Sequence, residues 1–287
     1  MIPNAKICLY PRDPAEAVRV LTEHGKRALI VAGGTTAAMS KSPDIDTLVD
    51  LTRLDVLDVE EHDDHWLLGC TLRLQDLAEH EGLANFFHGM LSTAARSVGS
   101  QAIRHAVTLG GNLVQLYRWS DMPVVILALG AQIELFGPDG ARWVDADDFF
   151  AKHPRQCMQE GEILTRVRVD KPVRPVAGSF VKFSRTAVDF GVVDVAVCLW
   201  LDKGKVALAR VVVGATRATP WRATEAEKLI TGRKLNAKLS AEAALAAKEQ
   251  AHVLSDVRTD KAYRKRMVGV IVGRALEQAA ALAKEQS

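Results

Sequence analysis

Two glycine pairs offer the residue types that bind a phosphate group. Residues 33–36 read Gly-Gly-Thr-Thr, and residues 108–112 read Thr-Leu-Gly-Gly-Asn. Glycine permits positive φ and lets a ligand approach the main chain closely, so that backbone N–H groups can point at an anion. Two such segments could hold a pyrophosphate from both sides. The spacing therefore predicts a binding site for a phosphorylated ligand.

Strand ends must position these glycines. Residues 28–32 and 107–109 are short apolar runs that stop at the two glycine pairs, and a helix is expected from Ser120 or Asp121 to Leu129. Ligands of α/β proteins bind at the carboxyl ends of strands. We therefore expect each glycine pair to form a loop at the end of a strand, with its N–H groups free for a ligand.

The remaining pattern predicts an α+β protein. A helix begins after Asp13, because a capping acid, a proline at the first helical position and a glutamate three residues after the cap occur together. A core-facing amphipathic helix is expected over residues 84–97. Further strands are expected over residues 47–51, 56–60, 66–70, 131–136, 141–145 and 163–169, the last completing a mixed sheet.

Residues 171–175, Lys-Pro-Val-Arg-Pro, mark a domain boundary, because two prolines cannot lie inside a sheet or helix. Beyond them we expect three strands and then three helices, over residues 178–186, 192–201, 205–215, 222–231, 238–252 and 260–284. The expected domains are residues 1–55, 56–175 and 176–287.

Composition excludes several classes of protein. The chain has 287 residues, 48% of them hydrophobic, and no apolar run reaches the ~18 residues of a membrane span. Its 37 basic and 35 acidic residues are interspersed, which argues against a nucleic-acid partner. The N-terminus lacks the pattern of a signal peptide. We expect a cytoplasmic protein.

Candidate metal ligands are few. The four cysteines, at positions 8, 70, 157 and 198, have no C-x-x-C spacing and are expected to be buried apolar side chains rather than iron–sulfur or zinc ligands. Residues 62–65, His-Asp-Asp-His, fit either a metal site or a solvated hairpin turn. The turn is favoured, because adjacent side chains on a hairpin tip point in different directions. No metal site is predicted.

Familiar catalytic and nucleotide motifs are missing from the sequence. No G-x-G-x-x-G follows a strand, and no G-x-x-x-x-G-K-[ST] occurs, which disfavours a Rossmann dinucleotide site and a Walker-type NTPase. G-x-S-x-G and H-E-x-x-H are also absent. No catalytic side chain is predicted, and the glycine segments remain as an unusual phosphate site.

Four segments, in this order and at these separations, resemble the FAD-binding medium subunit of molybdenum hydroxylases, the family of xanthine dehydrogenase and the carbon monoxide dehydrogenase flavoprotein. They are residues 32–36, residues 99–104 (Gly-Ser-Gln-Ala-Ile-Arg), residues 108–112 and the pair Ser120-Asp121; the likeness continues over residues 162–164, residues 180–185 with Asp189, and residues 263–266. The resemblance implies a two-subdomain PCMH-type FAD-binding domain, followed by a C-terminal domain of a three-stranded antiparallel sheet and helices.

The resemblance also implies which residues bind FAD. The first glycine segment would hold the pyrophosphate, and the second would close over the same dinucleotide. Asp121 would accept from the ribose or adjoining polar groups, Leu164 would pack against the adenine end, and Lys182 would lie near the polar edge of the flavin. By residue type alone, Asp121 also fits a helix cap and Lys182 a solvated strand position. The implied cofactor-binding residues are Ile30, Val31, Ala32, Gly33, Gly34, Thr35, Thr36, Ala37, Thr108, Gly110, Gly111, Asn112, Gln115, Asp121, Leu164 and Lys182.

As a family member, the chain would be the electron-transfer subunit of an oxidoreductase. A large molybdenum-cofactor subunit and a small subunit with two [2Fe-2S] clusters are the implied partners, as a dimer of heterotrimers. Electrons would leave FAD for NAD, a quinone, a cytochrome or oxygen. The run at residues 116–119, Leu-Tyr-Arg-Trp, departs from the family pattern. The alternatives are an assembly subunit in which Arg118 and Trp119 fill a decayed flavin site, and a free-standing flavin reductase.

Overall fold

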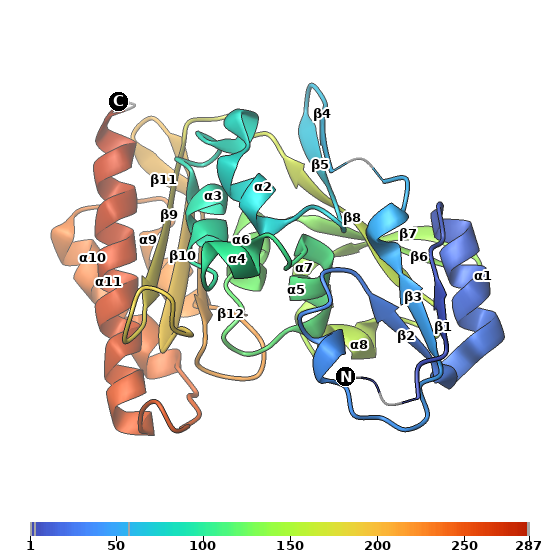
Figure 1. The fold of residues 1–287 in the computed structure, drawn as a ribbon. Helices are drawn as coiled ribbons and strands as arrows, with labels where there is room; N and C mark the ends of the chain where they lie inside the picture. The colour runs from blue at the N-terminus through green and yellow to red at the C-terminus, as the bar shows by residue number, and fades with distance from the viewer. Residues whose placement is uncertain (1, 3, 57, 286–287) are drawn as a thin grey trace. The chain divides into compact units, whose positions relative to one another are not determined.

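The computed structural model describes residues 2, 4–56 and 58–285 (Figure 1). The chain divides into two compact units: unit 1 is Met1–Asp76, Gln101–Gln115 and Ala131–Asp170, and unit 2 is Leu77–Ser100, Leu116–Gly130 and Lys171–Ser287. The chain therefore leaves and re-enters each unit. The contiguous division at residues 55 and 175 stays a prediction. Within the described residues, no helix has the length and apolar character needed to cross a membrane.

Unit 1 begins with a parallel sheet that leads into the first glycine segment. Strands β1 (Ile7–Leu9), β3 (Thr47–Asp50) and β2 (Ala28–Val31) lie in that order. Helix α1 (Pro14–His24) connects β1 to β2 and begins as expected, because the Asp13 carboxylate accepts from the Glu16 N–H at 2.8 Å. The first glycine segment follows the carboxyl end of β2.

A separate antiparallel sheet completes unit 1. Its strands, in spatial order, are β4 (Val59–Glu61), β5 (His65–Gly69), β8 (Ile163–Asp170), β6 (Gln132–Gly137) and β7 (Gly140–Asp145). These strands confirm the other segments expected from the sequence, but the strand expected over residues 56–60 begins only at Val59, and residue 57 lies outside the described residues. The expectation that residues 163–169 complete a mixed sheet is wrong, because every strand pairing in this sheet is antiparallel.

The second glycine segment is helical, so the prediction of a strand and a loop there is wrong. Helix α5 (Leu109–Gln115) includes both glycines, and Thr108 forms only an isolated bridge with Arg73. The Gly110 N–H donates to the Cys70 carbonyl at 2.9 Å. This contact with a neighbouring segment stabilises a helical turn that glycine disfavours by its own propensity.

The helix expected over residues 84–97 is shorter than its apolar pattern suggested. Helix α3 comprises Met90–Arg96. Before it, Phe87, His88 and Gly89 have φ of 45°, 56° and 70°, which a right-handed helix cannot include. Phe87 is buried and packs edge-on against Trp200, with 5.4 Å between ring centroids. Burial of this ring therefore stabilises a turn where the periodicity predicted a helix.

Unit 2 is an antiparallel sheet with helices on both faces (Figure 1). The sheet order is β12 (Trp221–Arg222), β11 (Lys205–Gly214), β10 (Val193–Asp202) and β9 (Val176–Phe183). Helices α9 (Thr224–Ile230), α10 (Ala237–Gln250) and α11 (Lys261–Glu285) share one apolar core with the sheet, whereas α3 and α6 (Met122–Leu129) pack against its other face. The interior strand β10 is almost entirely buried, which explains its continuous apolar run. The fourth strand, β12, was missed because two residues form no pattern.

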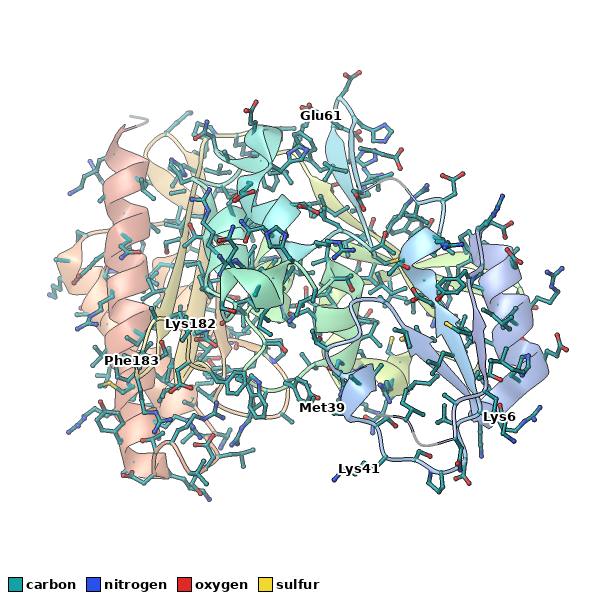
Figure 2. The ribbon with its side chains drawn as sticks, in the orientation of Figure 1. Lys6, Met39, Lys41, Glu61, Lys182 and Phe183 are labelled. Atoms are coloured by element: carbon teal, nitrogen blue, oxygen red, sulfur yellow. The ribbon has the colours of Figure 1, made fainter. Side chains whose placement is uncertain are left out.

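Short helices lie in the connections of the chain. They are α2 (Leu74–Glu79), α4 (Gln101–Arg104), α7 (Ala146–Phe149) and α8 (Pro154–Cys157), with 3₁₀ turns at Gly25–Arg27, Ala37–Met39, Leu51–Arg53 and Glu81–Leu83. The turn at Ala37–Met39 follows the first glycine segment directly, and Figure 2 labels the exposed Met39 there.

The cap of α10 allows a test of this local structure. The Asn236 side chain accepts from the Leu239 N–H at 2.9 Å and satisfies a donor that the helix cannot. We expect Asn236→Ala to lower the free energy of unfolding by about 0.5–2 kcal/mol, measured by urea unfolding. Lys238→Ala, an exposed change in the first turn of the same helix at a side chain that makes no capping bond, is the control. Equal stability of the two variants would contradict the capping role.

Candidate cofactor-binding site

The first predicted segment, residues 30–37, runs from β2 through a tight loop into the 3₁₀ turn. Gly34 has φ +71°, and a Cβ added to it would meet no atom within 4 Å. The loop closes where the Ala38 N–H donates to the Gly34 carbonyl at 2.9 Å. Positive φ and open space at Gly34 leave room for a ligand against the main chain.

The donors of this loop are uncommitted. Among the described residues, the backbone N–H groups of residues 33–36 donate to no protein acceptor, and the hydroxyls of Thr35 and Thr36 have no partner. Backbone N–H groups in folded proteins are paired with protein, ordered water or a ligand. Consecutive unpaired N–H groups around a left-handed residue form a concave site for an anion. This loop therefore fits a diphosphate.

Gly33 brings the two glycine segments together. A Cβ at Gly33 would lie 1.7 Å from the Ala106 carbonyl oxygen and 3.2 Å from the Val107 Cα. The first loop thus packs directly on the backbone that leads into Thr108. No residue with a side chain fits there without moving one of the two segments.

The second segment contributes differently from what we expected. Its N–H groups are not free, because Gly110 donates to Cys70, Gly111 donates to the Thr108 hydroxyl at 3.2 Å, and Asn112 donates to the Thr108 carbonyl at 3.0 Å. The prediction of free backbone donors on both loops is therefore wrong for this one. The Asn112 side-chain oxygen, however, is buried without a hydrogen-bond partner. That acceptor needs a donor from water or a ligand.

Two other predicted residues of unit 1 lie within protein contacts. The Gln115 side-chain oxygen accepts from Arg155 at 2.8 Å, and its carbonyl lies 3.3 Å from His153 Nε2. Leu164 is buried in β8, opposite Leu135 of β6. Their assignment to FAD stays a prediction.

Asp121 and Lys182 form an ion pair inside unit 2. The Lys182 ammonium donates to Asp121 Oδ2 and to the Ser97 carbonyl, each at 2.9 Å, and the side chains of Lys182 and Asp121 are at least nine-tenths buried. Burial raises the pKa of Asp121 to about 6, against the opposing effect of Lys182. Asp121 precedes α6 but makes no side-chain capping bond. Asp121 is therefore not a helix cap, and Lys182 is not a solvated strand residue, although their residue types alone also fitted those roles.

Asp194 of β10 lies beside this pair, and the sequence reasoning missed it. It is fully buried, and its backbone is the Cα partner of Lys182 across the sheet. Burial raises the pKa of Asp194 well above its ordinary value, and the nearby Asp121 carboxylate raises it further. An aspartate inside the run of valines at residues 192–197 was the available signal, because central strands rarely bury an acid without a partner.

Arg118 and Trp119 are held by unit 2. Arg118 lies 2.5 Å from Asp256, which also pairs with Arg258 at 2.6 Å. Trp119 stacks on the Tyr117 ring at 5.2 Å between centroids. Asp256 thus pairs with the arginine that the decayed-site alternative places in the flavin cradle.

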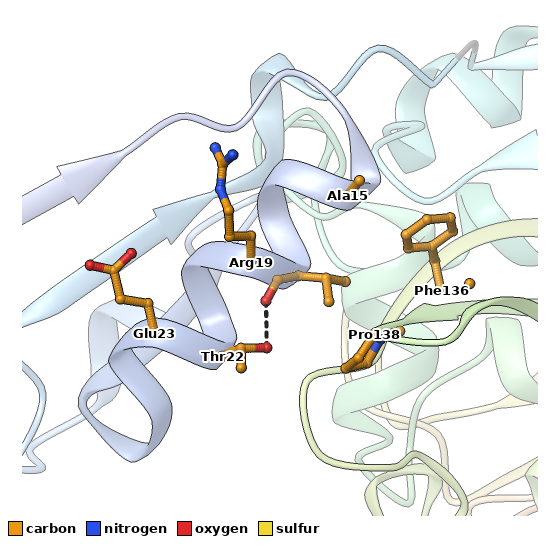
Figure 3. A pocket seen from close by; sticks show the side chains of 9 residues that line it. Ala15, Arg19, Thr22, Glu23, Phe136 and Pro138 are labelled. Carbon is orange, nitrogen blue, oxygen red and sulfur yellow. Dashed lines mark hydrogen bonds between the residues drawn. The ribbon is translucent and has the colours of Figure 1, made fainter.

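Among the remaining candidates, Cys70 and Cys198 are buried as expected, but that expectation is wrong for Cys8, which is exposed, and for Cys157, which is half-buried. His62 and His65 stack at 4.4 Å between ring centroids, and no group of three or more metal-ligating side chains gathers among the residues described. A groove of ≈ 510 Å³ lies in unit 1, and Figure 3 shows the side chains that line it. There the Thr22 hydroxyl donates to the Val18 carbonyl at 2.9 Å. The groove is lined by Ala15, Val18, Arg19, Thr22, Glu23, Phe136, Gly137, Pro138 and Gly140, none of them a predicted site residue.

Family models match most of the chain. Residues 4–172 match the FAD binding domain in molybdopterin dehydrogenase, and residues 178–279 match the CO dehydrogenase flavoprotein C-terminal domain. The two matched regions correspond to the two kinds of domain that the resemblance implied, and FAD is accordingly the cofactor of the chain.

Similar proteins agree with these models. The carbon monoxide dehydrogenase medium chain of Afipia carboxidovorans is 31% identical over 99% of this chain and 100% of its own length. The xanthine dehydrogenase FAD-binding subunit of Escherichia coli O157:H7 is 23% identical over 94% of each chain. In the solved carbon monoxide dehydrogenase of Hydrogenophaga pseudoflava, one chain matches with a TM-score of 0.91 and 26% identity, over 98% of this chain and 99% of that one. This chain therefore belongs to the FAD-binding medium-subunit family of the molybdenum hydroxylases, which are oxidoreductases.

Proposed function

We propose that this chain is the electron-transfer flavoprotein of a molybdenum hydroxylase complex. FAD supplies the redox chemistry when bound. In this proposal the electrons come from the [2Fe-2S] clusters of a small partner subunit, which receives them from a large molybdenum-cofactor subunit, and they leave for NAD, a quinone, a cytochrome or oxygen. The proposed assembly is a dimer of heterotrimers. Its cytoplasmic location also stays a prediction.

The uncommitted donors of residues 33–36 carry this proposal for the chain itself. A decayed flavin site has no reason to retain consecutive N–H groups and two hydroxyls without protein partners. Hydrogen bonds from such donors to a charged diphosphate are stronger than those to neutral acceptors. We propose that these residues hold the FAD diphosphate and that the unpaired oxygen of Asn112 accepts from the cofactor or from a bridging water.

The side chains of this chain bind and orient the cofactor in this proposal. None is proposed as a nucleophile or general base. Residues 30–32, Ala37, Thr108, Gly110, Gly111, Gln115, Asp121, Leu164 and Lys182 remain predicted cofactor-binding positions. The organic substrate is oxidised on the partner subunit.

A visible spectrum of the purified chain tests the proposal. We expect a yellow protein with the absorption of bound flavin, inert toward organic substrates by itself, because the substrate site belongs to the partner. The complex pulled down with this chain should contain molybdenum and iron, measured by metal analysis. A colourless chain, purified together with its partners, would contradict the proposal.

The free-standing reductase makes the opposite prediction in the same preparation. Such an enzyme would elute alone from a sizing column and oxidise NAD(P)H without partners. We expect this chain to elute together with its partners, and the isolated chain to oxidise NAD(P)H more slowly than the complete complex does. Efficient NAD(P)H oxidation by the isolated, monomeric chain would favour the reductase.

A further inference from the structure

Three buried ionisable side chains meet between the strands and helices of unit 2. Lys182 lies on β9, Asp194 lies opposite it on β10, and Asp121 lies at the start of α6. Asp194 and Asp121 are 0% and 3% exposed. Two carboxyl groups thus face one ammonium group in a place that water does not reach.

Three of the carboxyl oxygens in this cluster have no hydrogen-bond donor. The ammonium of Lys182 donates to Asp121 Oδ2 and to the Ser97 carbonyl. Asp121 Oδ1 and both carboxylate oxygens of Asp194 are buried with no hydrogen-bond partner. If both carboxyls were ionised, three buried oxygens would lack donors and the cluster would carry a net negative charge. Arg258 is the other cation that acts on Asp194, through space only.

The backbone around Asp194 leaves no room for a larger ligand. A Cβ added at Gly191 would lie 2.2 Å from Asp194 Oδ1, and one at Gly214 would lie 3.7 Å from the Asp194 Cβ. Lys182 already supplies the positive charge, which disfavours a metal cation. A proton needs no added volume, and an unpaired buried carboxylate protonates rather than bear the cost of desolvation.

We propose that Asp121 and Asp194 bind one proton between them, donated by the Asp194 carboxyl to Asp121 Oδ1, and that Asp194 thereby positions the Asp121–Lys182 pair. With one proton, each buried carboxyl oxygen of Asp121 has a donor, and the three groups together carry no net charge. This inference concerns unit 2 alone and does not depend on the proposed function.

The proton shared by Asp121 and Asp194 should make the stability of the folded chain fall as pH rises. The folded state holds the proton at a pH where an unfolded aspartate has lost it, because the pKa of Asp194 is raised on folding. The unfolding equilibrium constant should therefore rise with pH, by up to about tenfold per pH unit, from the ordinary pKa of aspartate up to the raised one. Asp194→Asn, whose amide can donate without titrating, should lose this dependence and be the more stable form near neutral pH.

Carbon-13 NMR of the full chain, labelled at the aspartate carboxyl carbons, tests the proposal directly. We expect one aspartate carboxyl to remain protonated far above the ordinary range in the wild type. That resonance should be missing in Asp194→Asn and present in Asp202→Asn, an exposed aspartate at the far end of the same strand. Titration of every aspartate in the ordinary acidic range would overturn the proposal.

The variants add a second readout. Urea unfolding across the same pH range should show parallel curves for the wild type and Asp202→Asn, and a flatter curve for Asp194→Asn. Asp194→Ala, which removes the donor, should be less stable than Asp194→Asn. A wild type and an Asp194→Asn variant with parallel curves would also overturn the proposal. If a variant does not fold, the wild-type NMR titration still decides.

Discussion

Replacing Gly34 with asparagine is expected to leave the purified protein without FAD. The substituted side chain would occupy the open space beside the uncommitted N–H groups, while asparagine tolerates the left-handed backbone that Gly34 adopts. Displacing the diphosphate from two donors would forfeit roughly 1.5–3 kcal/mol for each charge-assisted hydrogen bond. Affinity for FAD should therefore fall by roughly 10²- to 10⁴-fold, measured as flavin absorbance per chain after desalting.

Gly204→Asn is the matched control for this change. Gly204 has φ +72°, against +71° for Gly34, and a Cβ added there also meets nothing within 4 Å. It lies in the turn between β10 and β11, so the control reproduces the backbone cost of the substitution alone. Full flavin content in Gly34→Asn would contradict the proposed diphosphate site. Equal loss in both variants would point to folding instead.

Lys182→Met is expected to destabilise the chain by about 3–5 kcal/mol, the usual result of removing one partner from a buried ion pair. Methionine has a similar length but leaves Asp121 and Asp194 buried without their nearest cation. Urea unfolding measures the loss. Lys205→Met, an exposed lysine at the start of β11, controls for the change of residue type.

The pH dependence of this variant has a defined sign. Lys182 lowers the pKa of Asp121 and that of Asp194, so its removal raises both folded values further above those of the unfolded chain. The folded variant then binds more protons than the unfolded chain, and its stability falls as pH rises through this window. The penalty of Lys182→Met should accordingly be smallest in mild acid and largest at alkaline pH. A penalty independent of pH would mean that Lys182 does not face titrating carboxyls.

The sequence correctly predicted those elements whose conformation depends on residues close together in the chain. The start of α1 follows from a capping aspartate and a proline that act within one turn of chain. The hairpin of β6 and β7 follows from alternating apolar residues around a turn, and the position of the first glycine loop follows from the end of an apolar strand. Each of these signals is complete within about ten residues.

Local sequence failed where a distant segment decided the conformation. The second glycine segment is helical because it bonds to the Cys70 carbonyl, and residues 87–89 leave the helix because the Phe87 ring packs on Trp200. Glycine and periodicity gave weak local preferences, which such contacts override. Pairing of the strands into separate parallel and antiparallel sheets also depends on contacts far apart in the chain.

The sequence by itself determined the family and the cofactor and predicted a phosphate-binding site at residues 33–36, because the glycines, the threonines and their order are properties of the chain. Only the tertiary structure decided which donors remain free and which acids share a site. Burial in the packed fold raises the pKa of Asp121 and that of Asp194. Burial is a property of the packed fold, and no spacing of residues along the chain encodes it locally.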